Sequence, residues 1–381
     1  MTKTLLPSRL RLALSCSALL WMAGCTSVPP APTGELALPA AVGAGVEQLL
    51  AKAQPGPGWM TRFQRRTLNL ESVLDRPSGQ QTRGTLEVES QFARKLAADY
   101  PQVTIAAPGD AARADWALSS ALVWRQDNGQ PRRPTLEMTL SDPRTGKVLA
   151  ETSMRVRTDS VDSTPTLFFQ DSPVLIPAPG AAPNAAQRAT AASLAAPIRD
   201  AMATYDAGRS DEALTLFETA GKTGGADDMR VQIGLYLANR KLGRNDDAAK
   251  AFAQIVTIGI AKRSLAVKFL FEPAKTEFWS DPAVSGQYGV WIDEIAKHAA
   301  QSAVCIAVIG HSSHTGTPEY NDQLALQRAN RIGEMLTQAA PALGTRLQES
   351  GRGFRENLIG TGTDDVRDAL DRRVEFKFDA C

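Results

Sequence analysis

The segment that decides the fold lies at residues 304–329 and reads VCIAVIGHSSHTGTPEYNDQLALQRA. Its first six residues, 304–309, are all apolar, which predicts a strand. Residues 310–316, GHSSHTG, follow that strand as a loop. From 322 to 338 the apolar side chains recur every three or four positions, which predicts a long helix with one broad apolar side.

The flanking sequence extends this order to the whole C-terminal part, residues 261–381. Residues 266–271 predict a strand, and residues 284–300 predict a helix with an apolar side. Residues 374–378 alternate apolar and polar side chains, as a strand does. The expected order is therefore β-α-β-α-β.

This part resembles the OmpA-like peptidoglycan-binding domain, from about Ser264 to the end of the chain. The family patterns are Gly-His-Thr-Asp-x-x-Gly, Asn-x-x-Leu-Ser-x-x-Arg-Ala, Gly-x-Gly and Asn-Arg-Arg-Val-Glu. The matching segments here are 310–316 (GHSSHTG), 321–329 (NDQLALQRA), 351–353 (GRG) and 371–375 (DRRVE).

The resemblance implies recognition of diaminopimelate in the peptidoglycan stem peptide, a ligand end with carboxylates and an ammonium group. Asn321 and Arg328 are seven residues apart, two helical turns, so they share one helix face. The planar guanidinium of Arg328 can grip a carboxylate with two hydrogen bonds. His311 belongs to the family motif. Arg373 matches the second arginine of the last motif, where it supports the site or forms a fold-stabilising ion pair.

One site residue departs from the family pattern. Ser313 stands where the family has an aspartate that would hold the ligand ammonium. Loss of a charge-assisted hydrogen bond weakens binding by roughly ten- to a hundredfold. Glu319 or Asp322 could substitute for the missing carboxylate. His311 and His314 lack a third ligand nearby in sequence, so no metal site is expected.

The first 24 residues have the layout of a secretory signal peptide: a basic start, an apolar run and small residues before Cys25. The stretch 20–25, LWMAGC, resembles a bacterial lipobox, which implies that Cys25 carries acyl chains such as palmitate. Residues 25–45 then form the lipidated cysteine and a linker, with a proline-rich tether at 26–41. Thr26 after the cysteine implies sorting to the outer membrane, facing the periplasm. The alternative is an ordinary cleaved signal with a chance cysteine.

Charge and cysteine content narrow the partners further. The chain has 381 residues, with 42 lysines and arginines against 41 acids. Loss of residues 1–24 removes three bases and no acid and leaves a net charge of −2, which argues against nucleic acid as a partner.

The cysteines predict one disulfide. If Cys16 leaves with the signal and Cys25 is acylated, two thiols remain in an oxidising compartment. We expect a Cys305–Cys381 disulfide, because their strands run oppositely from the loop at Gly310; the alternative is two free thiols.

Residues 46–172 predict an N-terminal α+β domain with a helix packed on a sheet. The expected helices are 46–53 and 82–100, and the expected strands are 66–73, 103–106, 116–125, 135–141 and 148–157. The segments 73–82 (VLDRPSGQQT), 114–118 (ADWAL) and 140–148 (LSDPRTGKV) resemble lipoproteins that activate penicillin-binding proteins, and flagellar and curli-associated lipoproteins. That resemblance implies a protein-binding scaffold. An unrelated α+β domain is the alternative.

A repeat occupies residues 198–260, after a proline- and alanine-rich linker at 173–197. Gly208, Ala213 and Phe217 recur 35 positions on as Gly243, Ala248 and Phe252. This period resembles the tetratricopeptide pattern, and the alternative is an ordinary helical hairpin. Two units are too few for independent stability, so they must lean on a neighbour or on a capping helix at 192–205.

These features predict an α+β multidomain protein: a non-enzymatic, cofactor-free outer-membrane lipoprotein that tethers to peptidoglycan. Its repeats and N-terminal domain would present binding surfaces to an unknown periplasmic protein; the N-terminal resemblance implies, more narrowly, a role in regulating cell-wall synthesis. The alternative is an envelope assembly or secretion scaffold whose OmpA-like domain has lost wall binding. A wall hydrolase is disfavoured, because the sequence shows no nucleophile–base pair in a plausible motif and no metal-ligand cluster.

Overall fold

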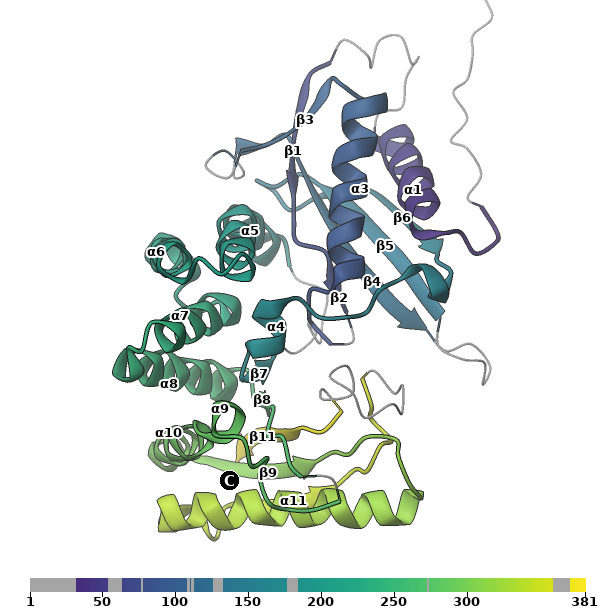
Figure 1. Ribbon diagram of the computed structural model, residues 1–381. Coiled ribbons are helices and arrows are strands. Elements are labelled where there is room, and N and C mark those ends of the chain that lie inside the picture. Colours follow the sequence, from purple (N-terminus) through teal and green to yellow (C-terminus); the bar gives the residue numbers. More distant parts are fainter. Residues whose placement is uncertain are drawn as a thin grey trace, which may run out of the picture.

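A computed structural model of the chain reveals two large hydrophobic cores (Figure 1). The first core belongs to the N-terminal sheet and its helices. The second runs without a break from the helices in the middle of the chain into the C-terminal sheet. The residues that the structure describes are 32–53, 64–76, 78–107, 110, 113–125, 133–176, 184–272, 274–358 and 371–381.

The N-terminal part is a sheet with helices on one face, as the sequence predicts. Its elements are α1 (Leu38–Ala53), β1 (Arg66–Leu70), β2 (Leu74–Asp75), α3 (Arg83–Asp99), β3 (Val103–Ile105), β4 (Trp116–Arg125), β5 (Arg133–Ser141), β6 (Val148–Arg155) and the 3-10 turn η2 (Thr158–Ser160). The strand order is β3-β1-β4-β5-β6, with β2 beside β4. Helices α1 and α3 lie side by side over the sheet (Figure 1).

The N-terminal domain begins earlier than the sequence suggested. Helix α1 starts at Leu38, not at residue 46, because Leu38, Ala41 and Val42 are buried in the core. Leu36 already forms a bridge with Val156 at the end of β6. The end of the expected tether at 26–41 is therefore part of the domain. The signal peptide and Cys25 lie outside the described residues.

The expected linker at 173–197 is also structured where it is described. The elements here are α4 (Leu167–Asp171), β7 (Val174–Leu175) and α5 (Ala185–Asp206). Strand β7 pairs with the C-terminal sheet, and Phe168 and Phe169 enter the second core. Helix α5 begins at the N-cap Asn184 and contains Pro197, so the proline does not mark the end of a linker.

The two repeat units form consecutive helical hairpins. The helices are α5, α6 (Ser210–Ala220), α7 (Met229–Lys241) and α8 (Asn245–Ala261), with the π-helical turn η3 (Gly221–Gly225) after α6. Gly208 and Gly243 follow α5 and α7 with φ of 77° and 72°, the left-handed conformation that glycine adopts without strain. The repeated alanines and phenylalanines are all buried.

The C-terminal part is a five-stranded sheet with the order β10-β9-β11-β8-β7. Its elements are β8 (Ser264–Val267), α9 (Pro282–Ser285), α10 (Tyr288–Gln301), β9 (Val304–Gly310), α11 (Pro318–Ala339), the 3-10 turn η4 (Pro341–Leu343), β10 (Leu347–Gly351) and β11 (Val374–Ala380). The predicted β-α-β-α-β order is confirmed, and β7 and β10 are added to it. A disulfide joins Cys305 to Cys381, the pair expected from the sequence.

Candidate ligand site at the strand ends

The loop that follows β9 lies where three strands and a helix meet. Gly310, the last residue of β9, is in register with Gly351 of β10 and with Val374 of β11. Helix α11 begins against these strand ends. A Cβ added to Gly310 would lie 2.0 Å from the carbonyl oxygen of Ala325 on α11. The glycine of the motif is thus required for the close approach of helix and strand.

Asn321 holds the loop rather than facing solvent. It is 2% exposed, and its Nδ2 donates to the carbonyl oxygens of Thr315 at 2.9 Å and Thr317 at 3.1 Å. Thr317 is the N-cap of α11, and its side chain accepts from the backbone N–H of Tyr320. Asn321 therefore ties the loop to the helix start, a positioning role that its place on the Arg328 face had not suggested.

Arg328 lies two turns further along α11 and is also buried, at 3% exposure. Its Nε donates to the carbonyl oxygen of Lys275 at 3.1 Å, and its Nη2 donates to that of Glu272 at 3.3 Å. The guanidinium carbon lies 4.9 Å from the ring centroid of Phe271. Arg328 therefore fastens α11 to the loop after β8, so a carboxylate ligand would meet a guanidinium whose orientation is already set.

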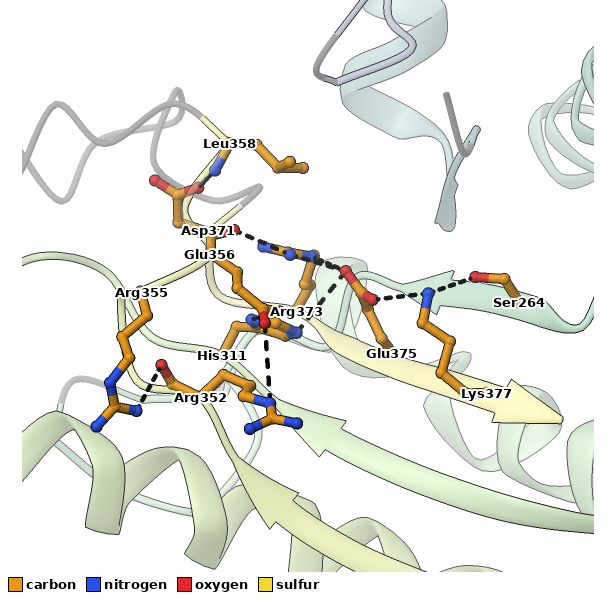
Figure 2. A network of polar contacts seen from close by, with 10 residues as sticks. All are labelled: Ser264, His311, Arg352, Arg355, Glu356, Leu358, Asp371, Arg373, Glu375 and Lys377. Atoms are coloured by element: carbon orange, nitrogen blue, oxygen red, sulfur yellow. Dashed lines mark hydrogen bonds and ion pairs between the residues drawn. The ribbon is translucent and has the colours of Figure 1, made fainter. Parts of the chain in front are cut away.

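His311 and Arg373 belong to a buried polar network beside the loop (Figure 2). The Nε and Nη2 atoms of Arg373 both contact Oε1 of Glu375 at 2.7 Å, and Nη2 donates to the carbonyl oxygen of Glu356 at 3.2 Å. Glu375 also pairs with Lys377 at 3.2 Å. This geometry favours the fold-stabilising ion pair, one of the two roles that the sequence left open for Arg373.

The ring of His311 is held neutral at the edge of this network. It is 1% exposed, and neither ring nitrogen has a hydrogen-bond partner among the described residues. Burial, and next the charge of Arg373, lowers the pKa of His311 to about 3. Burial opposes ionisation of Glu375, but the charge of Arg373 and its hydrogen bond to the carboxylate outweigh this effect and lower the pKa of that carboxyl.

Ser313 is half-buried in the loop, where the family pattern has an aspartate. Asp322, one candidate for the missing carboxylate, is ion-paired with Arg355. Glu319, the other candidate, is exposed in the first turn of α11. In the described ranges, no three histidine, cysteine or carboxylate side chains come together as metal ligands would.

The segment after β10 supplies residues that the sequence reasoning missed. Arg352 and Arg355 are exposed, and the ring of Phe354 lies 4.3 Å from that of His314. The backbone joins the two loops, because the N–H of Ser312 donates to the carbonyl oxygen of Gly353 at 2.9 Å. The only sequence signal was the position of these residues beside the motif glycines 351 and 353. The site thus has a buried polar base and a rim of aromatic rings and paired arginines.

The comparison with protein families finds a match only in the C-terminal part of the chain. Residues 281–370 match the model of the OmpA family. No curated protein matches the chain.

The similar solved structures each cover about a third of this chain. The peptidoglycan-associated lipoprotein from Burkholderia pseudomallei is 21% identical over 31% of this chain and 92% of its own, with a TM-score of 0.26. The cell wall anchor of the T6SS from Pseudomonas aeruginosa is 22% identical over 34% and 97%, with a TM-score of 0.27. The periplasmic domain of Helicobacter pylori MotB is 24% identical over 31% and 73%, with a TM-score of 0.26. The match of residues 281–370 to the OmpA family identifies the C-terminal βαβαβ part of this chain as an OmpA-like domain.

Proposed function

We propose that the OmpA-like domain binds the diaminopimelate end of the peptidoglycan stem peptide and so tethers the protein to the cell wall. The observation that carries this proposal is the match of residues 281–370 to the OmpA family, together with Arg328 held in a fixed orientation on the helix that follows the motif loop. The function is binding and not catalysis.

The residues divide into those that contact the ligand and those that hold the site. Arg328 and the half-buried Ser313 face the two charged ends of the ligand, a carboxylate and the ammonium. Asn321, His311 and Arg373 are positioning residues, because their hydrogen bonds or burial keep the loop and the last strand in place. Without an aspartate at 313, the ammonium end lacks the charged partner that the family pattern places there, so we expect weak binding.

Sedimentation of the full chain with isolated sacculi tests the proposal. The full chain is needed because α10 packs on α8 within one continuous core. We expect Ser313→Asp to strengthen binding by roughly tenfold at low salt, because it restores a charge-assisted bond. The gain should shrink as salt rises, since a partly exposed charge pair is screened. We expect Arg328→Ala to abolish binding.

The matched control is Arg331→Ala, which removes an exposed arginine from the same helix. Thermal unfolding of each variant separates lost binding from lost folding, because Arg328 also donates to two carbonyl groups. If folded Arg328→Ala binds as well as Arg331→Ala, the site is elsewhere. If neither the parent chain nor Ser313→Asp binds sacculi, the assembly-scaffold function replaces the wall tether; Ser313 is the observation that favours that second function.

The rest of the proposal concerns the anchor and the partner. Acyl chains on Cys25 would hold the chain at the outer membrane; none of the helices in the described ranges is long and apolar enough to cross a membrane. The helical hairpins and the N-terminal domain would then present surfaces to a periplasmic protein, with regulation of wall synthesis as one use. Intact mass of the mature protein without acyl groups would contradict the anchor.

A further inference from the structure

A cavity of about 380 Å³ lies where the α4 segment, the helical hairpins and the C-terminal part meet. Its walls come from α4, from the ends of α5 and α7, from the residues after β8 and from the start of α10. In Figure 1, α4 lies beside α7 and above β7, the edge strand of the C-terminal sheet. The volume is within the range of roughly 300–1,000 Å³ that small-ligand sites occupy.

The polar lining of this cavity is strongly basic. It contains Arg240, Lys241, Lys268 and Arg372 against one carboxylate, Asp171. That carboxylate is already satisfied, because it accepts from the hydroxyl of Tyr205 at 2.7 Å and pairs with Lys241 at 3.1 Å. Arg240, Lys241 and Lys268 already outnumber this one carboxylate, so the lining carries a net positive charge without counting Arg372.

Lys268 is the cationic lining residue whose amine contacts only neutral acceptors among the described residues. Its Nζ donates to the carbonyl oxygens of Phe169 at 2.7 Å and Gln170 at 3.1 Å, which are neutral acceptors. Among the described residues it forms no ion pair, and burial lowers its pKa to about 7. Lys268 is half-buried, and withdrawing an ammonium group from water without a carboxylate partner is costly, so an anion bound in the cavity would lower that cost.

The remaining walls are aromatic and held in place. Trp291 donates through Nε1 to the hydroxyl oxygen of Tyr236 at 2.9 Å. The ring of Tyr288 lies 4.8 Å from that of Trp291, and its hydroxyl oxygen accepts from the backbone N–H of Leu270 at 3.0 Å. These hydrogen bonds hold the aromatic side chains in place before any ligand binds, so binding costs little additional side-chain entropy.

We propose that this cavity binds a carboxylate carried on a short apolar or aromatic body, with Lys268 and Arg240 at the carboxylate and Tyr236, Tyr288 and Trp291 around the body. Two sources have this chemistry: a free aromatic acid and the C-terminal residue of a peptide chain. In either case the ligand would touch the helical hairpins and the OmpA-like domain at once. Apart from Arg372, none of the lining residues belongs to the segments that match the family motifs.

Calorimetric titration of the full chain tests the site with three probes. They are phenylbutyrate, N-acetylalanylphenylalanine and the C-terminal amide of that dipeptide. We expect the acids to bind and the amide to bind at least tenfold more weakly, because only the acids carry the charge. Tighter binding of the dipeptide acid identifies a chain terminus as the source, and equal binding of both acids identifies a free acid.

Matched lysine variants assign the binding to the cavity. Lys268→Met should weaken the acids by roughly ten- to a hundredfold, and the exposed Lys222→Met should leave them unchanged. Arg240→Gln gives a second test should Lys268→Met fail to fold. The proposal is overturned if no acid binds saturably at millimolar concentration, if the amide binds as tightly as the acid, or if the cavity variants bind like Lys222→Met.

Discussion

Two histidines three positions apart in the loop after β9 occupy opposite environments. His314 is exposed and lies against Phe354, whereas His311 is enclosed among charged groups. Its pKa of about 3 in the folded chain compares with an ordinary value of 6.5. This difference makes the free energy of unfolding depend on pH. Between the two pKa values, the unfolded chain binds a proton that the folded chain does not.

We predict that acidification destabilises the protein through His311. Between pH 6.5 and the folded pKa of about 3, the unfolded state binds more protons. The free energy of unfolding therefore falls as pH falls, by up to about 1.4 kcal/mol per pH unit from this one group. His311→Gln should remove that slope, measured by urea unfolding at roughly pH 5 to 7.

The matched control is His314→Gln, which should keep the slope of the parent chain. Each variant must be compared with the parent at each pH, because Glu89 also titrates in this range. Burial raises the pKa of Glu89 to about 7, so its protonation raises the free energy of unfolding as pH falls, opposite to the effect of His311. Equal slopes for His311→Gln and the parent would contradict the prediction.

At the scale of elements, the contact of α11 with the strand ends shapes the candidate site. Gly310 and Gly351 lie under the first turns of the helix, and each would bring a Cβ within 2.5 Å or less of a backbone oxygen there. The backbone of α11 can approach the sheet this closely only where the strand residue is a glycine, which has no Cβ. The motif glycines thus serve the packing that brings Asn321 and Arg328 to the loops.

We predict that Gly310→Ala lowers the free energy of unfolding by at least about 1–3 kcal/mol, because α11 must move away from β9. Gly289→Ala is the control: that glycine is exposed on α10 and a Cβ there meets nothing within 4 Å. Alanine should stabilise the helix at that position by up to about 1 kcal/mol. Urea unfolding curves of the two variants with opposite shifts would support this account, and equal shifts would not.

At the scale of the whole molecule, the chain between the two cores decides how the parts combine. After β6 it runs through α4, whose Phe168 and Phe169 enter the second core, and then through β7, which pairs with β8. Trp291 of α10 stacks on Phe252 of α8 at a centroid distance of 5.6 Å. The helical hairpins, which were too few to be stable alone, share one core with the OmpA-like domain.

We predict that Phe168→Ala destabilises this shared core by about 3–5 kcal/mol, because a fully buried ring in contact with Tyr205 and Phe217 is lost. Leu167→Ala, its exposed neighbour, should change stability by less than about 0.5 kcal/mol. Urea unfolding measures both. Similar values for the two variants would mean that α4 is not part of the core.

The sequence alone determined the elements that carry their own pattern. The helix and strands of the N-terminal sheet, the helical hairpins and the β-α-β-α-β order each have apolar side chains at the period of their element. The residues of the loop at 310–316 could be predicted as site residues for a different reason: their motif is short and continuous in the sequence.

Only the tertiary structure decided the features that depend on distant partners. Strand β10, LQESG, has no alternating apolar pattern, and β7 has two residues; both are strands because they pair with β9 and β8. Arg328 donates to carbonyl groups 53 and 56 positions away, and the cavity around Lys268 joins residues from six segments. Local periodicity carries no information on such contacts, because they arise from pairing and burial between segments that meet only in the folded chain.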